Sequence, residues 1–165
     1  MKKIGLLGII LAAFICVHCS KAEDPERECW LPANSLACEV LATTSDCPVA
    51  PVAGADDDIR GKWKLMNTLQ PFTSEGRILN DHSCHNTVYH FQVDGTLTIS
   101  SDREGVPIGQ YEYEFKHQPL FEYYDDMGYT LEIGNRKEAC SIFEGKMILD
   151  NSYVDGPIRY LIRIQ

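Results

Sequence analysis

Beyond residue 58, apolar and polar residues alternate in short stretches, and turn residues separate these stretches every eight to twelve positions. Alternation with a period of two is typical of β-strands that bury one face, because successive side chains of a strand point to opposite sides. Tyr111, Tyr113 and Phe115, which alternate with two glutamates, show it most clearly. The pattern predicts eight strands, at residues 60–68, 87–93, 97–99, 111–115, 129–133, 140–143, 146–150 and 159–164.

Tight turns join most of these strands, and Asp94-Gly95 is a strong hairpin signal. Short sequential hairpins favour an up-and-down barrel over a sandwich, and closure removes the exposed strand edges. We therefore predict an all-β fold, an eight-stranded antiparallel barrel whose first and last strands are neighbours, with one long connection at residues 69–86. The side chains expected to face the interior are Trp63, Tyr89, Phe91, Tyr111, Tyr113, Phe115 and Tyr129.

The first predicted strand opens with Gly61-Lys62-Trp63, which resembles the Gly-x-Trp motif of lipocalins and of bacterial lipocalin-like lipoproteins. The hairpin at 91–97, the Gly-x-Tyr at 109–111 and the Met-x-Leu at 147–149 extend this resemblance along residues 59–164. The resemblance implies a barrel that binds a small, partly hydrophobic ligand, and a basic residue near the last strand, here Arg163, packed on Trp63. The chain departs from strict lipocalins because no Thr-Asp-x-x-Tyr motif lies between the strands at 140–143 and 146–150.

The N-terminus has the pattern of an export signal. Lys2 and Lys3 precede an apolar run at residues 4–17, which is shorter than the ~20 residues that a helix needs to span a bilayer. Cys19 follows this run, as in the signal of a bacterial lipoprotein whose new N-terminal cysteine carries acyl chains such as palmitate. Cys16 is the other candidate for acylation, and an ordinary secretory signal is the alternative interpretation.

This interpretation divides the chain into three parts. Residues 1–18 are the predicted lipoprotein signal peptide, residues 19–58 a lipidated Cys19 followed by an acidic, Pro-rich flexible linker, and residues 59–165 the lipocalin-like barrel. We expect the protein to be anchored by its lipid to the outer membrane, on the periplasmic or the surface-exposed face.

Charge limits the partners of the chain. The formal net charge is −9, and loss of the two signal-peptide lysines makes the mature chain more acidic still. No basic stripe is present to neutralise phosphates, so nucleic acid is not expected to bind. Electrostatic adhesion to anionic headgroups is excluded for the same reason, and membrane attachment is therefore assigned to the lipid.

An exported protein can form disulfides. In the predicted barrel, Cys84 precedes the second strand and Cys140 opens the sixth, so both lie at the same rim. We therefore predict a Cys84–Cys140 disulfide that fixes the connection at 69–86 across this rim as a lid, with two separate thiols as the alternative. Cys29, Cys38 and Cys47 are equally spaced, which favours a local disulfide over a metal site and leaves their pairing open.

Candidate chemistry is sparse. His82, Cys84, His85 and His90 could form a metal cluster, but loop histidines beside a disulfide cysteine are more often solvated, so no metal or other cofactor is expected. No nucleophile elbow or phosphate-binding loop is present in the sequence, and we do not expect an enzyme. Two functions remain: a barrel that binds a small ligand, or a filled barrel that contacts another protein of the cell envelope through Phe121, Tyr123 and Tyr124.

Overall fold

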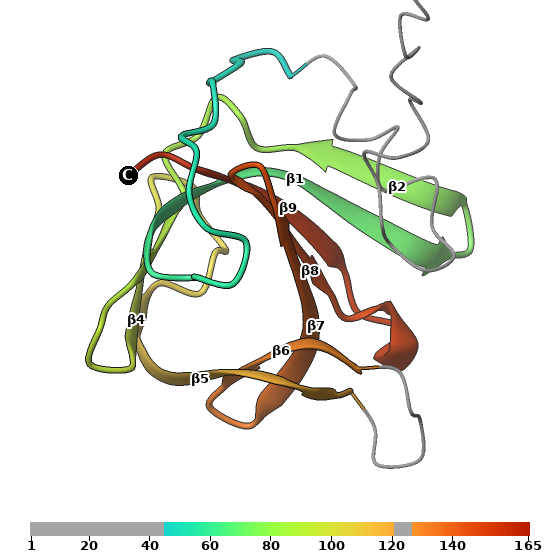
Figure 1. Cartoon of the computed structure of the whole chain (residues 1–165). Coiled ribbons are helices and arrows are strands. Elements are labelled where there is room, and N and C mark those ends of the chain that lie inside the picture. The colour runs from blue at the N-terminus through green and yellow to red at the C-terminus, as the bar shows by residue number, and fades with distance from the viewer. Residues whose placement is uncertain (1–44, 121–126) are drawn as a thin grey trace, which may run out of the picture. The chain divides into compact units, whose positions relative to one another are not determined.

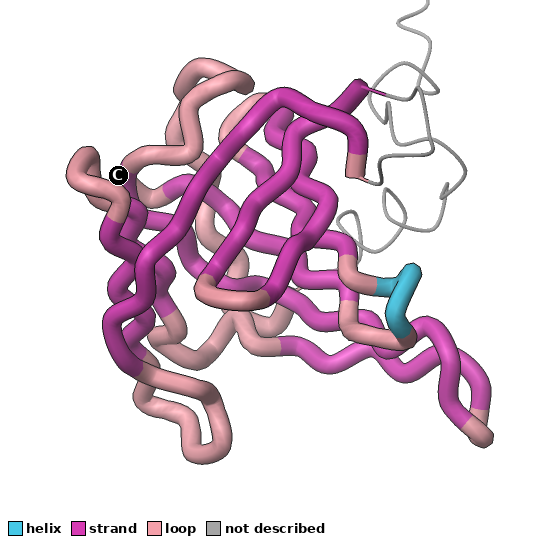
Figure 2. The backbone as a smooth tube through the Cα atoms, turned by 90° about the horizontal axis from the view of Figure 1, so that it is seen from below, coloured by secondary structure: helices cyan, strands magenta, loops and turns pink. Residues whose placement is uncertain are grey.

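The computed structural model describes residues 45–120 and 127–165, and these residues form an antiparallel sheet that closes on itself (Figure 1). A single short 3-10 helix, η2 (Ser152–Val154), stands among the strands of this part of the chain, as Figure 2 shows in cyan. The strands are β1 (Gly61–Thr73), β2 (Gly76–Asp81), β3 (Val88–Phe91), β4 (Thr96–Ser100), β5 (Gly109–Pro119), β6 (Met127–Ile133), β7 (Arg136–Phe143), β8 (Lys146–Asp150) and β9 (Ile158–Arg163).

The barrel closes through the pairing of β1 with β9. Each strand from β3 to β8 pairs with the next one along the chain, and β1 pairs with β3 on one edge and with β9 on the other. In the register of β1 and β9, Trp63 lies opposite Arg163. The prediction of an eight-stranded antiparallel barrel with neighbouring first and last strands is therefore confirmed.

The sequence did not predict β2. This strand pairs with the second half of β1, with Leu69 opposite Leu79, so the two strands form a hairpin that extends from the barrel wall (Figure 1). Every residue of β2 except Asn80 is exposed, and a strand without a buried face lacks the alternation from which strands are recognised. The region expected to be a long connection thus contains the end of β1 and all of β2.

Residues 45–58, the last part of the predicted flexible linker, lie against the barrel. The backbone N–H of Val52 donates to the carbonyl of Arg163 at 2.8 Å, and the N–H of Glu144 donates to the Asp56 carboxylate at 3.2 Å. This segment crosses in front of the barrel opening in the view of Figure 1. The folded unit therefore begins before residue 59, the predicted boundary.

Several predicted features lie outside the described residues. These are the signal peptide at 1–18, the lipidation site Cys19, the cysteines Cys29 and Cys38, and the aromatic patch of Phe121, Tyr123 and Tyr124. Within the described residues, no helix has the length and hydropathy needed to cross a membrane.

Candidate functional site

One end of the barrel interior is organised around Trp63, whose side chain is fully buried. Its indole N–H donates to the carbonyl of Ile59 at 2.6 Å, and the guanidinium carbon of Arg163 lies 4.5 Å from the ring centroid. Arg163 also donates from Nη2 to the carbonyls of Ala55, at 3.1 Å, and of Asp58. The predicted contact between Arg163 and Trp63 is present, and the same guanidinium holds residues 55–58 against the barrel.

Gly61 is required where β1 begins. Its φ is +114°, a conformation that side chains rarely adopt, and a Cβ atom at this position would lie 2.4 Å from the carbonyl oxygen of Gln165. The backbone N–H of Lys62 donates to the same oxygen at 3.0 Å. A glycine two residues before Trp63 therefore allows the C-terminus to approach the start of β1.

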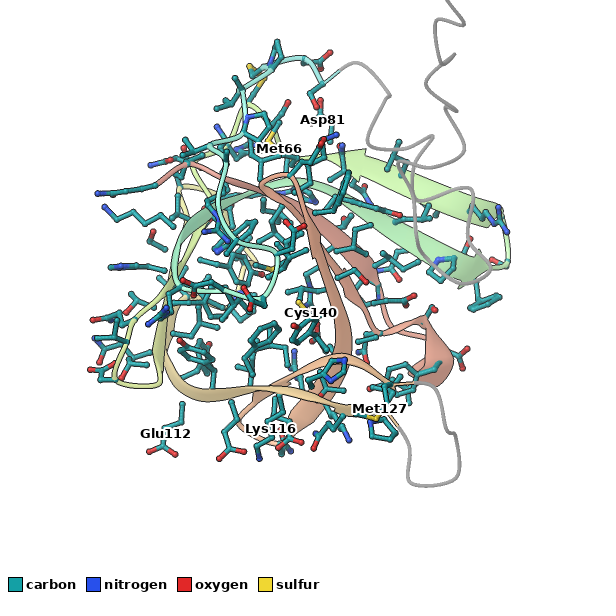
Figure 3. All side chains as sticks on the ribbon, in the orientation of Figure 1. Met66, Asp81, Glu112, Lys116, Met127 and Cys140 are labelled. Carbon is teal, nitrogen blue, oxygen red and sulfur yellow. A yellow bond between two sulfur atoms is a disulfide. The ribbon has the colours of Figure 1, made fainter. Side chains whose placement is uncertain are left out.

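The seven aromatic side chains predicted to face inward belong to, or pack against, one hydrophobic cluster inside the barrel. Glu112 and Lys116 of β5 point away from the barrel in Figure 3, whereas Cys140 of β7 lies within it. Because strand side chains alternate, the aromatic residues of β5 face the interior. They are Tyr111, Tyr113 and Phe115, which pack against the cluster together with Tyr129, and the cluster itself contains Trp63, Tyr89 and Phe91.

These side chains differ in burial along the barrel wall. Tyr89 and Phe91 on β3 are 5% and 1% exposed, whereas Tyr111, Tyr113, Phe115 and Tyr129 on β5 and β6 are only partly buried. The rings of Phe115 and Tyr129 stack with centroids 4.8 Å apart. Inward-facing aromatic surface on β5 and β6 is therefore accessible to solvent, and we call these four side chains the aromatic row.

An ion pair lies on the interior face beside the aromatic row. Glu138 on β7 is opposite Leu131, and Arg159 on β9 is opposite Leu149; both leucines belong to the hydrophobic cluster. Nη1 of Arg159 donates to both carboxylate oxygens of Glu138, at 3.0 and 2.7 Å. Glu138 is 1% exposed, so this carboxylate is held inside the barrel by its partner.

No hydrogen bond of the Tyr89 hydroxyl is found among the described residues, and this hydroxyl is not one of their fully buried unpartnered atoms, although the residue as a whole is only 5% exposed. Burial raises the pKa of Tyr89, so the phenol stays protonated and can donate. Tyr113, by contrast, donates to the carbonyl of Gln92 at 2.7 Å. The Tyr89 hydroxyl is therefore available to a further group in the interior.

The predicted Cys84–Cys140 disulfide is wrong. Cys84 is bonded to Cys47, with Cα atoms 5.0 Å apart, and Cys140 is a buried free thiol. The error arose because β7 begins at Arg136, four residues before Cys140, which places Cys140 inside the barrel and away from the rim. Burial raises the pKa of the Cys140 thiol, so this cysteine does not form a reactive thiolate.

The histidines of the predicted metal cluster have other partners. Arg103 donates to Nδ1 of His82, so Nε2 carries the proton and donates to Thr68 Oγ1 at 2.9 Å. Cys84 is in a disulfide, and Nδ1 of His85 lies 3.6 Å from Asp102. In residues 45–120 and 127–165, no three His, Cys, Asp or Glu side chains are grouped as metal ligands would be.

Sequence reasoning missed the interior ion pair. Glu138 and Arg159 each occupy a position that alternates with apolar inward residues, but the predicted strands began at Cys140 and at Arg159, so neither was assigned to the interior. An acidic residue two positions before an inward cysteine was the available signal. Comparison of the chain with family models, with curated proteins and with solved structures gave no match.

Proposed function

We propose that this protein is a membrane-anchored, lipocalin-like lipoprotein that binds a small, partly hydrophobic ligand inside its barrel. One observation carries the proposal: the aromatic row faces the interior and is nevertheless accessible to solvent. A ligand that covered these rings would bury apolar surface, which stabilises a complex by roughly 25 cal/mol per Å². The interior of an eight-stranded barrel is either filled by its own side chains or holds one small ligand, and the accessible aromatic row favours the second.

Two features support stable binding by a preformed interior. The barrel is closed by the β1–β9 pairing, and the Trp63 end is covered by residues 55–58, which Arg163 holds in place. A closed wall with one covered end restricts access to the remaining surface. A ligand would therefore meet a site that needs little reorganisation, which lowers the cost of binding.

Native mass spectrometry of the purified protein, in a volatile buffer with a compatible detergent, tests the proposal. We expect a bound small molecule that is lost or weakened at least tenfold in Phe115→Ala, a change within the aromatic row. Phe143→Ala is the matched control, because Phe143 lies on the outer face of β7 and is 40% exposed. The proposal is overturned if no small molecule binds, either from the cell or from an added panel of lipids. It is also overturned if Phe115→Ala and Phe143→Ala weaken binding equally.

The anchoring part of the proposal concerns Cys19. Acylation there would attach the barrel to the outer membrane through residues 20–44. Metabolic labelling with palmitate should label the wild-type chain and Cys16→Ala but not Cys19→Ala, and only Cys19→Ala should leave the membrane fraction. Labelling of Cys19→Ala at the wild-type level would contradict it.

A second function is favoured by the β1–β2 hairpin. Among the described residues, β2 pairs only with β1, so its other edge is free, and Phe72 near the tip is 68% exposed. A free edge can take another strand by backbone hydrogen bonds. We propose as the alternative that a cell-envelope protein adds a strand to β2.

A photo-crosslinking amino acid placed at position 72 tests this alternative in intact cells. The same amino acid at position 93 is the control, because Val93 is 84% exposed but lies in the β3–β4 turn, away from β2. Adducts at position 72 alone support a partner on the hairpin. Equal adducts at both positions would show that exposure, and not the hairpin, determines the contacts.

A further inference from the structure

The interior ion pair has unused hydrogen-bonding capacity. Arg159 donates to Glu138 from Nη1 only, and its Nη2 and Nε groups have no partner among the described residues. The fully buried polar atoms without a partner in this part of the chain are Tyr160 Oη and Arg163 Nε, so the free donors of Arg159 are not sealed off. Its side chain is 13% exposed.

Tyr89 supplies a third donor in the same interior. No hydrogen bond of its hydroxyl is found among residues 45–120 and 127–165, and Tyr89 belongs to the same cluster as Leu131 and Leu149, which lie opposite Glu138 and Arg159. These donors are not among the fully buried unpartnered atoms of the described residues, so water can reach them when no ligand is bound. A ligand that displaced this water would have to supply an acceptor oxygen, because a donor that loses its hydration without compensation is destabilising.

The charge of the pair decides which oxygen fits. Glu138 already neutralises Arg159, and a ligand carboxylate would place a second buried anion beside one guanidinium, with little solvent to screen the repulsion. A ligand ammonium would face the donors and offer no acceptor. A neutral carbonyl oxygen can accept from both residues and adds no charge.

We propose that Arg159 and Tyr89 bind the neutral carbonyl oxygen of an apolar ligand whose chain lies against the aromatic row. This inference rests on the proposed function, since it requires a ligand in the barrel. It assigns Glu138 the role of a positioning residue, which holds the guanidinium and selects against anionic ligands.

Native mass spectrometry with three ten-carbon probes tests the inference on the full chain. The probes are 2-decanone, decanoate and decylamine, which share chain length and differ in the polar group. We expect 2-decanone to bind at least fivefold more tightly than either charged probe. Tyr89→Phe should weaken 2-decanone about fivefold, as loss of one hydrogen bond does, while Tyr160→Phe, which removes an unpartnered hydroxyl on the other face of β9, should not.

Glu138→Gln gives a readout that a merely structural role would not produce. Removal of the carboxylate charge frees Arg159 for an anion, so decanoate should bind about tenfold more tightly than to the wild type, and the preference should shift towards it. If the probes bind with equal affinity and Tyr89→Phe and Glu138→Gln change nothing, the inference fails while ligand binding stands. If no probe binds, both the inference and the proposed function fail.

Discussion

The guanidinium of Arg163 lies 4.5 Å from the ring centroid of Trp63, at the point where the last strand of the barrel meets the first. The same side chain donates two hydrogen bonds to carbonyls of residues 55 and 58. One residue therefore joins both ends of the barrel sheet to the segment that precedes it.

We predict that Arg163→Met destabilises the protein by about 2–3 kcal/mol. The change removes a cation–π contact of ~0.5–1 kcal/mol and two hydrogen bonds of about 1 kcal/mol each. Urea unfolding followed by tryptophan fluorescence measures the effect. Arg60→Met is the control, because the Arg60 side chain is 58% exposed and solvent screens its pair with Asp58, so this change should have little effect on stability. Equal losses in the two variants would contradict the role of Arg163.

Gly61→Ala should cost more than Gly76→Ala. Both glycines have a positive φ, +114° and +94°, so each substitution strains the backbone by about 1 kcal/mol or more. At Gly61 the new Cβ would also meet the carbonyl oxygen of Gln165 at 2.4 Å, whereas nothing lies within 4 Å at Gly76. The difference in Tm between the two variants measures the cost of the clash with Gln165, because both variants share the cost of the positive φ. A Tm for Gly61→Ala at or above that of Gly76→Ala would show that the C-terminus moves aside freely.

The Cys47–Cys84 disulfide should stabilise the folded chain by about 4 kcal/mol on the chain-entropy estimate, because it closes a loop with a sequence separation of 37. Cys47→Ser/Cys84→Ser should lower the free energy of unfolding by about this amount. Dithiothreitol should destabilise the wild-type protein in the same way and have much less effect on the double variant. If dithiothreitol destabilised the double variant as strongly as the wild type, the reducible bond that matters for stability would be a different one.

Stability should decrease as the pH falls below about 6.5 because of His82. Burial lowers the pKa of His82, with a further contribution from Arg103, so the unfolded chain binds this proton at a higher pH than the folded one. The stabilising contribution is complete above the unfolded pKa and is lost between the unfolded and folded values.

Urea unfolding between pH 7.5 and 5 measures this dependence. His82→Gln should flatten the slope, while His85→Gln should retain it. The range avoids Asp58, whose pKa is lowered by its hydrogen bond from Arg60 and whose contribution is lost only below about pH 4. If the free energy of unfolding of His82→Gln depended on pH as steeply as that of the wild type, another group would be responsible.

The barrel could be predicted because its signals are local. Alternation of apolar and polar residues marked the eight strands of the wall, and Asp94-Gly95 marked the turn between β3 and β4, where Gly95 has a φ of +85°. The neighbourhood of Trp63 and Arg163 was implied by the resemblance to lipocalins together with closure of the barrel. These features depend on residues close in sequence and on one topological rule.

The remaining features depend on positions that only the folded chain brings together. In β9 the inward side chains are Arg159, Leu161 and Arg163, whereas Ile158, Tyr160 and Ile162 are buried on the other face. Periodicity alone assigns apolar residues to the interior, so it could not identify a strand with two inward arginines. The partner of Cys84 was likewise set by the path of residues 45–58, which no local pattern reports.

The disulfide at Cys47 also determines how the barrel would respond to mechanical load. A pull from the N-terminal side reaches the described residues at position 45 and meets the covalent bond to Cys84 two residues later. Cys84 lies between β2 and β3, so covalent tension enters the barrel wall at β3 and does not run through the start of β1 with Gly61 and Trp63. Under oxidising conditions the covalent path of a force applied from the N-terminal side would therefore bypass residues 48–83, which include all of β1.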